Sequence, residues 1–569
     1  MSLNKKYILF LFGIGIVFFF PFLGNVHLFD WDEINFAESA REMLQTGDYF
    51  RVQINYEPFW EKPPFFFWLQ VASMKFFGVN EFAARFPNAL IGVISLITLY
   101  QIGKKLISER FGFIWSLVYF ASFLPHLYFK SGIIDPFFNF FIFLSIYFLV
   151  LTINKPTNKK LNSLVAGIFI GLAIITKGPV GLLLLILTLL VYLIIKKFKQ
   201  KIHISSVIIF FLSSLGVSFL WFGYETITNS PWFIVEFIQY QIELLTEPVA
   251  GHEQPFYYHF VVVLLGCFPM SILAIPAFRK RTEEIPYDFM LWMKILFWVV
   301  MILFTIVKTK IVHYSSMSYL PLSFLAATMV YSFWEEGKQG KINKVLSTSY
   351  LAIGSIFALL LIAVPILFQN SNWITPYIKD DFAVASFNVD MNWQGWEFIF
   401  GILFLVGLIF SYINLKKKNI MKFLIIIGIS SGVTLLGYAI FVVPKIEKFS
   451  QGPAIEFYES MQGKDVYVST YGFKSYAHFF YTKFPPRKDY EGIQQIKIAY
   501  KSTLTDLKKY NPNQLKNLVN DWLLKGDIDK DVYIVTKITL GDEMNEFPDL
   551  DLINTEGGFN FYLRKKTTL

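Results

Sequence analysis

The sequence predicts a polytopic α-helical membrane protein that ends in a small α/β domain. Of its 569 residues, 54% are hydrophobic and only 16% are charged, whereas a soluble globular protein carries about 25% charged residues. Apolar runs of about 20 residues, the length that crosses a bilayer, recur along the chain. After residue 443 the sequence becomes charged and mixed. These observations predict a transmembrane part at 1–443 and a soluble extracytoplasmic domain at 444–569.

The apolar runs give about thirteen expected spans. The first follows Lys5-Lys6 and lacks a small-x-small cleavage site, so it is interpreted as an uncleaved span. The expected spans are 7–24, 87–103, 111–128, 134–153, 161–177, 179–195, 204–222, 257–276, 289–307, 317–334, 346–368, 397–415 and 421–443.

Basic residues in short loops predict the orientation. Clusters such as Lys104-Lys105, Lys196-Lys197 and Lys416-Lys417-Lys418 occur in alternate loops, and such loops face the cytoplasm. Lys5-Lys6 puts the N-terminus on the same side, and an odd number of spans then puts the C-terminal part on the other side. We therefore expect a multi-pass protein of the inner (plasma) membrane whose active site and C-terminal domain are periplasmic. The net charge of +9 follows from these loops and does not indicate a nucleic-acid partner.

The C-terminal segment shows strand-like runs at 465–469, 531–535 and 559–563, with helical patterns at 493–510 and 512–523 between them. This alternation predicts the small α/β domain. The single cysteine, Cys267, lies in an apolar run, so no intramolecular disulfide can form.

The first outer loop, 25–86, gathers charges beside an apolar span. Carboxylates and lysines at such a place are costly to desolvate and indicate a functional site by default. Apolar spacing predicts an amphipathic helix from Asp32 to Met43, lying at the membrane interface, and a second interfacial helix at 65–77. Asp30 and Glu33 are explained equally well as groups that stabilise the start of the first helix.

Ordered motifs in this loop and after it resemble those of the ArnT-like aminoarabinose transferases. These enzymes belong to the GT-C superfamily of polyprenyl-phosphate-sugar glycosyltransferases, which includes the protein O-mannosyltransferases. The resemblance covers roughly residues 25–335, and it lies in the order of the motifs because each one alone is weak. The motifs are Asp32-Glu33, AESAREM at 37–43, Gly47-Asp48, EKPP at 61–64, Ile134-Asp135-Pro136, Thr176-Lys177-Gly178, His252 before PFYY at 255–258, and Lys308-Thr309-Lys310 before His313-Tyr314.

The resemblance implies a GT-C type fold and an inverting glycosyltransferase. It would move a sugar from a polyprenyl (undecaprenyl) phosphate donor in the membrane lipid to an envelope acceptor such as lipid A, on the outer face. A protein acceptor with the same donor is the alternative. The family often has Arg three residues after the loop aspartate, where this chain has Asn35, so the usual contact there is in doubt.

The chemistry requires cations for the leaving phosphate and a base when the acceptor is a hydroxyl. The resemblance makes Asp32 and Asp135 the catalytic candidates, although Asp135 before Pro136 is also a helix-start signal. Lys177 is equally a boundary lysine, and Tyr314 an aromatic-belt residue. The candidates for binding the donor phosphate are Lys62, Lys310, His313, Tyr314, Arg85 and Lys177; the other site candidates are Glu33, Asn35 and Glu61.

A divalent metal ion is the one cofactor with candidate ligands, Glu61 and His252, although His252 is most simply a loop histidine.

A transporter or lipid flippase is the alternative from another class of protein. Such proteins place charges at mid-membrane and carry two related halves, whereas the polar residues here collect at the outer boundary. The sequence contains neither a Walker-type loop nor GxGxxG, which argues against a nucleotide-driven pump.

Overall fold

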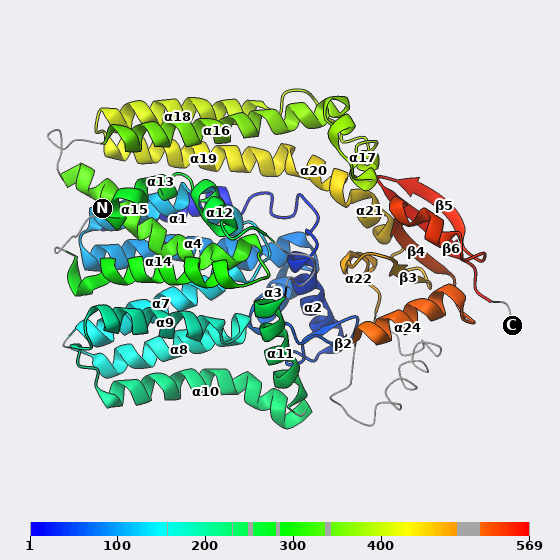
Figure 1. The fold of residues 1–569 in the computed structure, drawn as a ribbon, viewed down its shortest axis with the longest axis horizontal. Helices are drawn as coiled ribbons and strands as arrows, with labels where there is room; N and C mark the ends of the chain where they lie inside the picture. Colours follow the sequence, from blue (N-terminus) through cyan, green and yellow to red (C-terminus); the bar gives the residue numbers. More distant parts are fainter. Residues whose placement is uncertain are drawn as a thin grey trace.

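The computed structural model describes residues 2–155, 157–229, 231–247, 254–279, 285–335, 343–485 and 512–567. Long helices run alongside one another in a bundle, and a β-sheet lies at the end of the bundle opposite the N-terminus (Figure 1). The predicted helix at 493–510 and residue His252 lie outside the described residues. The expected fold class, a helical membrane part followed by a small mixed α/β part, is confirmed.

Each expected span corresponds to a helix or a broken helix. The helices of the bundle are α1 (Leu3–Phe19), α4 (Glu81–Leu106), α5 (Glu109–Phe120), α6 (Phe123–Tyr128), α7 (Asp135–Asn154), α8 (Lys159–Lys177), α9 (Val180–Ile195), α10 (Ile204–Asn229), α12 (Tyr258–Gly266), α13 (Met270–Ala274), α14 (Phe289–Ile306), α15 (Tyr319–Glu335), α16 (Lys344–Gln369), α18 (Ile399–Lys416) and α19 (Ile420–Phe441).

Not every one of the thirteen expected spans is a single helix of spanning length. Within the described residues, eight helices are long and apolar enough to cross a membrane, or nine if the segments Tyr258–Gly266 and Met270–Phe278 form one bent span. Those two segments meet at 105°. The run 111–128 breaks after Phe120 into α5 and α6, and α1, α9 and α15 have only 17, 16 and 17 residues. Apolar length alone does not reveal such breaks.

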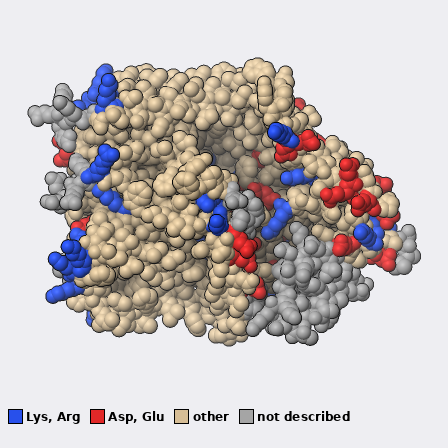
Figure 2. Space-filling model, viewed as in Figure 1, with Lys and Arg blue, Asp and Glu red and all other residues tan. Residues whose placement is uncertain are grey.

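Charged side chains are distributed unevenly along the bundle. On the face drawn in Figure 2, Lys and Arg side chains form a row at the end that carries the N-terminus, and most Asp and Glu side chains lie toward the C-terminal end. This is the arrangement that the positive-inside rule requires. The protein is therefore a multi-pass membrane protein with a basic end, and which side of the membrane that end faces stays a prediction.

Small residues bring neighbouring helices of the bundle close together. At the crossing of α4 and α5, a Cβ added to Gly112 would lie 2.2 Å from the carbonyl oxygen of Tyr100, and one added to Gly103 would lie 2.6 Å from the Cα of Gly112. A larger side chain at either position would force the helices apart. Such close backbone approach is typical of helix packing in membranes, where van der Waals contact drives association.

After α19 the chain passes through α20 (Val443–Ser450) and α21 (Gly452–Ser460) into a four-stranded sheet of order β3-β4-β6-β5. β3 and β4 are parallel and the other pairs are antiparallel. The elements of this part are β3 (Tyr467–Thr470), α22 (Ala477–Thr482), α24 (Pro512–Lys525), β4 (Val532–Lys537), β5 (Asp551–Glu556) and β6 (Phe559–Arg564).

Three of the four strands overlap the predicted ones, and α24 overlaps the predicted helix at 512–523. β5 was not predicted because all six of its residues are exposed, so it carries no buried alternation. The apolar residues Val535, Phe559 and Phe561 belong to the same buried core as the helical bundle, whereas Tyr467, Leu523 and Val532 belong to a separate core. One part of the sheet thus packs onto the bundle.

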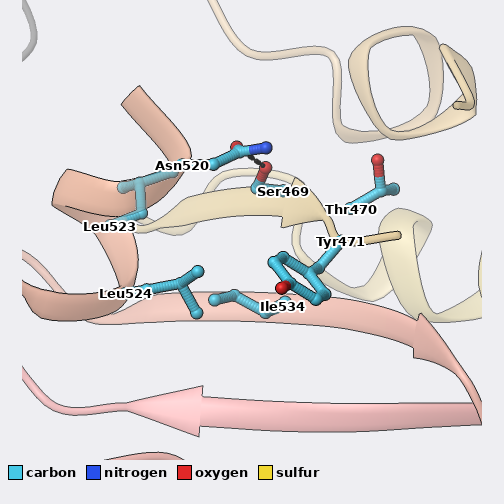
Figure 3. Close-up of a pocket in the computed structure, with 7 residues that line it drawn as sticks. All are labelled: Ser469, Thr470, Tyr471, Asn520, Leu523, Leu524 and Ile534. Carbon is cyan, nitrogen blue, oxygen red and sulfur yellow. Dashed lines mark hydrogen bonds between the residues drawn. The ribbon is translucent and has the colours of Figure 1, made fainter. Parts of the chain in front are cut away.

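A small pocket lies between α24 and the sheet (Figure 3). Across it, the Ser469 hydroxyl donates to Oδ1 of Asn520 at 3.1 Å. Its seven lining residues include no charged side chain. This pocket therefore has none of the groups that sugar transfer requires, and the candidate site lies elsewhere.

The first outer loop folds into α2 (Asp32–Thr46), the two-residue strands β1 (Gln53–Ile54) and β2 (Glu57–Pro58), and α3 (Phe65–Phe77). α2 ends at Gly47, whose φ of 73° is a left-handed conformation that glycine adopts without strain. The prediction of helices at both places is confirmed. The charged face of α2 is not at the protein surface, because every residue from Glu33 to Met43 is buried in the protein, and the position of α2 at the membrane interface stays a prediction.

Candidate functional site

Asp32 is the first residue of α2, where the positive end of a helix stabilises a carboxylate. Its side chain is 36% exposed, and its Oδ2 lies 3.8 Å from Nε2 of His313. The other ring nitrogen of His313, Nδ1, lies 3.1 Å from the Tyr128 hydroxyl. The 3₁₀ segment η4 (Val312–Ser318) and α6 therefore hold an imidazole beside the predicted catalytic carboxylate.

Asp135 and Lys177 form a second part of the site. Asp135 begins α7 and Lys177 ends α8, and Lys177 Nζ donates to Asp135 Oδ1 at 2.7 Å. The Ser316 hydroxyl lies 3.3 Å from the same Oδ1 and the ammonium of Lys177 lies 5.7 Å from the centre of the Tyr314 ring. The neighbouring helix ends thus bring a carboxylate, a cation and a phenol together.

Tyr314 connects the two parts. Burial raises its pKa most, and the nearby carboxylates of Asp32, Asp135 and Glu61 raise it further. A group that senses all three carboxylates must lie among them. Asp32 and Glu61 belong to the first outer loop, and Asp135 and Tyr314 to two other outer loops of the sequence, and the structure brings all four to one place.

Glu61 and Lys62 reach the same place from the first outer loop. The Glu61 carboxylate is hydrogen-bonded by the side chain of Tyr240, in α11 (Trp232–Thr246), and the pKa of Tyr240 is raised by burial and then by Glu61. Lys62 Nζ lies 5.6 Å from the centre of the Tyr240 ring. Tyr240 therefore contacts both charged residues of the EKPP motif.

Lys310 is placed differently from the other candidates. Its side chain is buried, and it lies close enough to His259 of α12 to act on it electrostatically. The preceding residue, Thr309, donates from its hydroxyl to the carbonyl of Glu247 at 2.7 Å. Within the described residues, no contact links Lys310 to Asp32, Asp135 or Lys62.

Arg85 and Glu33 form a buried ion pair, which replaces our interpretation of Arg85 as a phosphate ligand. Nε and Nη2 of Arg85 donate to the two carboxylate oxygens of Glu33 at 2.9 and 2.7 Å. The remaining N–H groups donate to the carbonyls of Leu23, Val26 and His27. Because a guanidinium has five N–H donors, none is left for a substrate.

Glu33 is satisfied in the same way. Burial raises its pKa, but Arg85 and the backbone N–H groups of Phe29 and Gly132 outweigh burial, so the pKa lies below its usual range. This carboxylate holds the loops before α2 and before α7 together. Its place is structural, through the ion pair with Arg85 and not through capping of α2.

Asn35 is buried, and its Oδ1 has no hydrogen-bond partner among the described residues. In the resembling family an arginine often takes this position and contacts the substrate; here the Asn35 oxygen makes no hydrogen bond to the described residues.

The metal prediction that pairs Glu61 with His252 cannot be followed, because His252 lies outside the described residues. Within those residues, no group of three or more His, Cys, Asp or Glu side chains is arranged to hold a metal ion.

Sequence reasoning missed a buried network in α2. Arg41 donates from Nε and Nη2 to the two carboxylate oxygens of Glu38, each at 2.7 Å, and from Nη1 to the carbonyl of Phe484. The Tyr56 hydroxyl donates to the same carbonyl at 2.9 Å. Burial and the neighbouring Glu38 raise the pKa of Glu42 well above its usual range. The AREM part of the motif therefore ties α2 to the C-terminal part.

Tyr128 and Tyr240 were missed as well. Both occur in aromatic-rich stretches, where a tyrosine that positions a catalytic group has the same sequence signal as one that packs against lipid.

The surface of the protein is hollowed where the helical bundle meets the C-terminal part (Figure 2). Charged side chains lie along the rim of this hollow.

Comparison with known proteins gives matches in sequence and in fold. A family described as dolichyl-phosphate-mannose-protein mannosyltransferase matches residues 61–222. An undecaprenyl phosphate-alpha-4-amino-4-deoxy-L-arabinose arabinosyl transferase of Wigglesworthia glossinidia brevipalpis is 28% identical over 56% of this chain and 58% of its own length. The enzyme of the same name from Photorhabdus laumondii subsp. laumondii is 26% identical over 63% of this chain and 66% of its own length. The matched region thus spans about three fifths of these relatives.

The crystal structure of ArnT from Cupriavidus metallidurans bound to undecaprenyl phosphate superimposes with a TM-score of 0.74, at 16% identity and over 98% of both chains. The apo structure of the same protein gives a TM-score of 0.73. The likeness extends over the C-terminal part, beyond the region where the sequence motifs occur. The resemblance stated from the motifs, and the fold that it implied, are both confirmed.

Proposed function

Because the chain is ArnT-like in sequence and in fold, we propose that it is an inverting glycosyltransferase that uses a sugar carried on undecaprenyl phosphate. The acceptor is an envelope glycolipid of the lipid A type. The observation that carries the proposal is the convergence of Asp32, Glu61, Asp135 and Lys177 around Tyr314, from separate segments of the chain.

The reaction forms a bond from an acceptor oxygen to the anomeric carbon and breaks the bond from that carbon to the carrier phosphate. The leaving phosphate takes the electron pair, and the cations Lys62 and Lys177 stabilise its growing charge. With a hydroxyl acceptor, Asp32 takes the proton. With a phosphate acceptor no proton moves, and Asp32 stabilises the positive charge that develops on the sugar.

His313 and Asp135 act beside these groups. His313 faces Asp32 through Nε2 while Tyr128 fixes its other nitrogen, so the imidazole holds the Asp32 carboxylate in place and does not bind the phosphate. Asp135 orients Lys177 and Ser316. The two carboxylates thus have different tasks, of which only that of Asp32 is at the reacting atoms.

We also propose that the site faces the extracytoplasmic side and that residues 444–569 form an extracytoplasmic domain. The clustering of Lys and Arg at the other end of the bundle supports this orientation. Labelling of single cysteines placed in the 25–86 loop, with a reagent that cannot cross membranes, tests it. Labelling only after the cells are opened would reverse the orientation.

Protein O-glycosylation with the same donor is the second candidate, and the match of residues 61–222 to a protein mannosyltransferase family favours it. The two candidates differ only in the acceptor. Mass spectrometry of lipid A and of secreted proteins from a deletion strain separates them, since only the true acceptor loses a sugar. The flippase alternative is excluded as the sole function if the purified protein transfers sugar in detergent, where no second compartment exists.

The central experiment is an assay of the purified protein with undecaprenyl-phosphate sugars and a lipid A acceptor. Transfer by the wild type and its loss in Asp32→Asn support the proposal. Transfer to lipid A that is unchanged in Asp32→Asn contradicts the site. Absence of transfer to lipid A combined with transfer to protein contradicts the acceptor class and leaves the donor class in place.

A further inference from the structure

Lys474 lies on the connection between β3 and α22, and its ammonium is held against two aromatic rings of the site. Nζ lies 4.5 Å from the centre of the Trp31 ring and 5.4 Å from that of Tyr476. Trp31 directly precedes Asp32. We propose that Lys474 forms an anion-binding subsite for a phosphate group of the acceptor, which makes it a specificity-determining residue. The identification of the anion as the acceptor's rests on the proposed function.

The subsite is fixed to the first outer loop by its neighbours. The rings of Trp31 and Tyr476 lie 6.4 Å apart and their side chains are hydrogen-bonded. The Asp30 carboxylate accepts hydrogen bonds from the Ser475 side chain and from the Tyr476 backbone. The backbone N–H of Asp30 donates to Oε1 of Gln451 at 3.3 Å. The C-terminal part thus presents Lys474 at a fixed place next to the predicted catalytic carboxylate.

The charge of Lys474 remains available to a ligand. Its side chain is exposed, and no carboxylate of the described residues forms an ion pair with it. Asp30 acts on it only at longer range, and burial raises the pKa of Asp30, which weakens that compensation. Contact with aromatic faces orients an ammonium without neutralising it. A compact, oriented cation of this kind suits a phosphate oxygen.

The position of Lys474 favours the acceptor over the donor as the source of the anion. The polyprenyl chain of the donor must stay against the apolar helices, and Lys62 and Lys177 approach the site from those helices and their loops. The connection between β3 and α22, which carries Lys474, belongs to the C-terminal part, and β3 and α22 lie at the end of the bundle (Figure 1). Tyr476 is close to Asp30, which lies beside Lys474, and to Glu61, which lies beside Lys62. The donor phosphate is therefore assigned to Lys62 and Lys177, and the acceptor anion to Lys474.

The test is binding of lipid A to the purified full-length protein, with the phosphorylated and the enzymatically dephosphorylated forms compared. We expect the wild type to bind the phosphorylated form about tenfold more tightly, as one charge-assisted contact would give. Lys474→Gln should lose this preference and Lys474→Arg should keep most of it. Lys525→Gln is the matched control, because Lys525 is also exposed and lies 5.2 Å from the centre of an aromatic ring, that of Phe547.

Binding of undecaprenyl phosphate, measured in parallel, identifies the source of the anion, and we expect Lys474→Gln to leave it unchanged. The proposal is overturned if the wild type does not prefer the phosphorylated form or if Lys474→Gln keeps the preference. It is also overturned if Lys474→Gln weakens binding of undecaprenyl phosphate as much as that of lipid A. If the preference depends on Lys474 but the wild type transfers no sugar to lipid A, the proposed function fails and the anion subsite stands.

Discussion

Asp32 and Glu33 are neighbours in the first turn of α2, and their carboxylates have opposite surroundings. Glu33 is buried and accepts hydrogen bonds from Arg85, from the N–H of Phe29 and from the N–H of Gly132. Asp32 is 36% exposed, and its only ion-pair partner among the described residues is His313, at 3.8 Å. Two acidic residues that look alike in the motif therefore differ in how much of their hydrogen-bonding capacity the protein itself uses.

This difference separates stability from chemistry. A buried carboxylate whose lone pairs are all occupied can hold loops together, but it cannot accept a proton from a substrate or approach a sugar. A carboxylate that keeps accessible surface next to one weak partner can do both. The comparison thus predicts that changes at Asp32 affect the rate of transfer, whereas changes at Glu33 or Arg85 affect the folded state.

The largest effect is expected for Asp32→Asn. Because the amide can neither take a proton nor stabilise developing positive charge, kcat/KM for sugar transfer should fall about 1,000-fold, or about 4 kcal/mol. The melting temperature should stay near that of the wild type, since the side chain is partly exposed and has only one weak partner among the described residues. Asp381→Asn is the control, because Asp381 is also the first residue of a helix, and it is exposed. A stable Asp32→Asn protein with normal kcat/KM would make Asp32 only a helix cap.

Arg85→Met should instead lower the free energy of unfolding. It leaves the Glu33 carboxylate buried without its cation, which costs about 3–5 kcal/mol. The double variant Glu33→Gln, Arg85→Met should be less destabilised than the sum of its single variants, because the uncompensated charge is gone. Thermal unfolding in detergent measures both. An Arg85→Met protein that is as stable as the wild type but no longer binds undecaprenyl phosphate would return Arg85 to the phosphate site.

Much of the fold could be predicted because apolar length and basic loops are local signals. The segment 204–222 is an example, since it lies within one unbroken helix, α10. Breaks such as the one at 105° between α12 and α13 depend on how neighbouring helices pack, so length and composition did not reveal them. The burial of the charged face of α2 was not predicted, for a related reason. Amphipathic spacing cannot show that the charges of Glu38 and Arg41 neutralise each other inside the protein.

For the site, the sequence predicted which loops meet. It did not predict which side chains already have protein partners and so cannot bind a substrate. Asp135 and Lys177 were separate candidates, and the structure makes them one ion pair. Arg85 had the right charge for phosphate, but five acceptors that only the fold brings together occupy it. Lys474 lies in a part of the chain without family motifs, so no sequence signal pointed to it. Pairing between distant segments is what the sequence alone does not show.

The pair of Asp135 and Lys177 tests an intermediate case, since it is an ion pair inside the candidate site. Lys177→Met should lower kcat/KM about 100-fold, or by about 2.7 kcal/mol, because one cation next to the leaving phosphate is lost. Lys196→Met is the control, because Lys196 forms an ion pair of the same length, 2.7 Å, with Asp288 at the basic end of the bundle. Equal effects of the two substitutions on kcat/KM would mean that Lys177 acts only on the fold.

The smallest effect concerns a histidine that joins the first outer loop to the C-terminal part. Nδ1 of His27 lies 3.1 Å from Oε1 of Glu447 in α20. Burial lowers the pKa of His27, but the hydrogen bond to Glu447 and its charge outweigh burial, so the pKa is raised. The folded protein thus holds the proton more tightly than the unfolded chain. The resulting stability is complete below the unfolded pKa of about 6.5 and is lost as the pH rises through the folded pKa.

We therefore expect the melting temperature to fall by about 2 °C or less between about pH 6 and pH 8, and His27→Gln to remove this slope. Glu33 should show the opposite dependence. Because its pKa is lowered in the folded state, its stabilisation is complete above the unfolded glutamate pKa and is lost as the pH falls through the folded one. The Glu33→Gln substitution should flatten only the acidic limb of the stability profile, and His27→Gln only the limb between about pH 6 and pH 8. A profile in which either substitution changes both limbs would mean that the two contacts are coupled through the first outer loop.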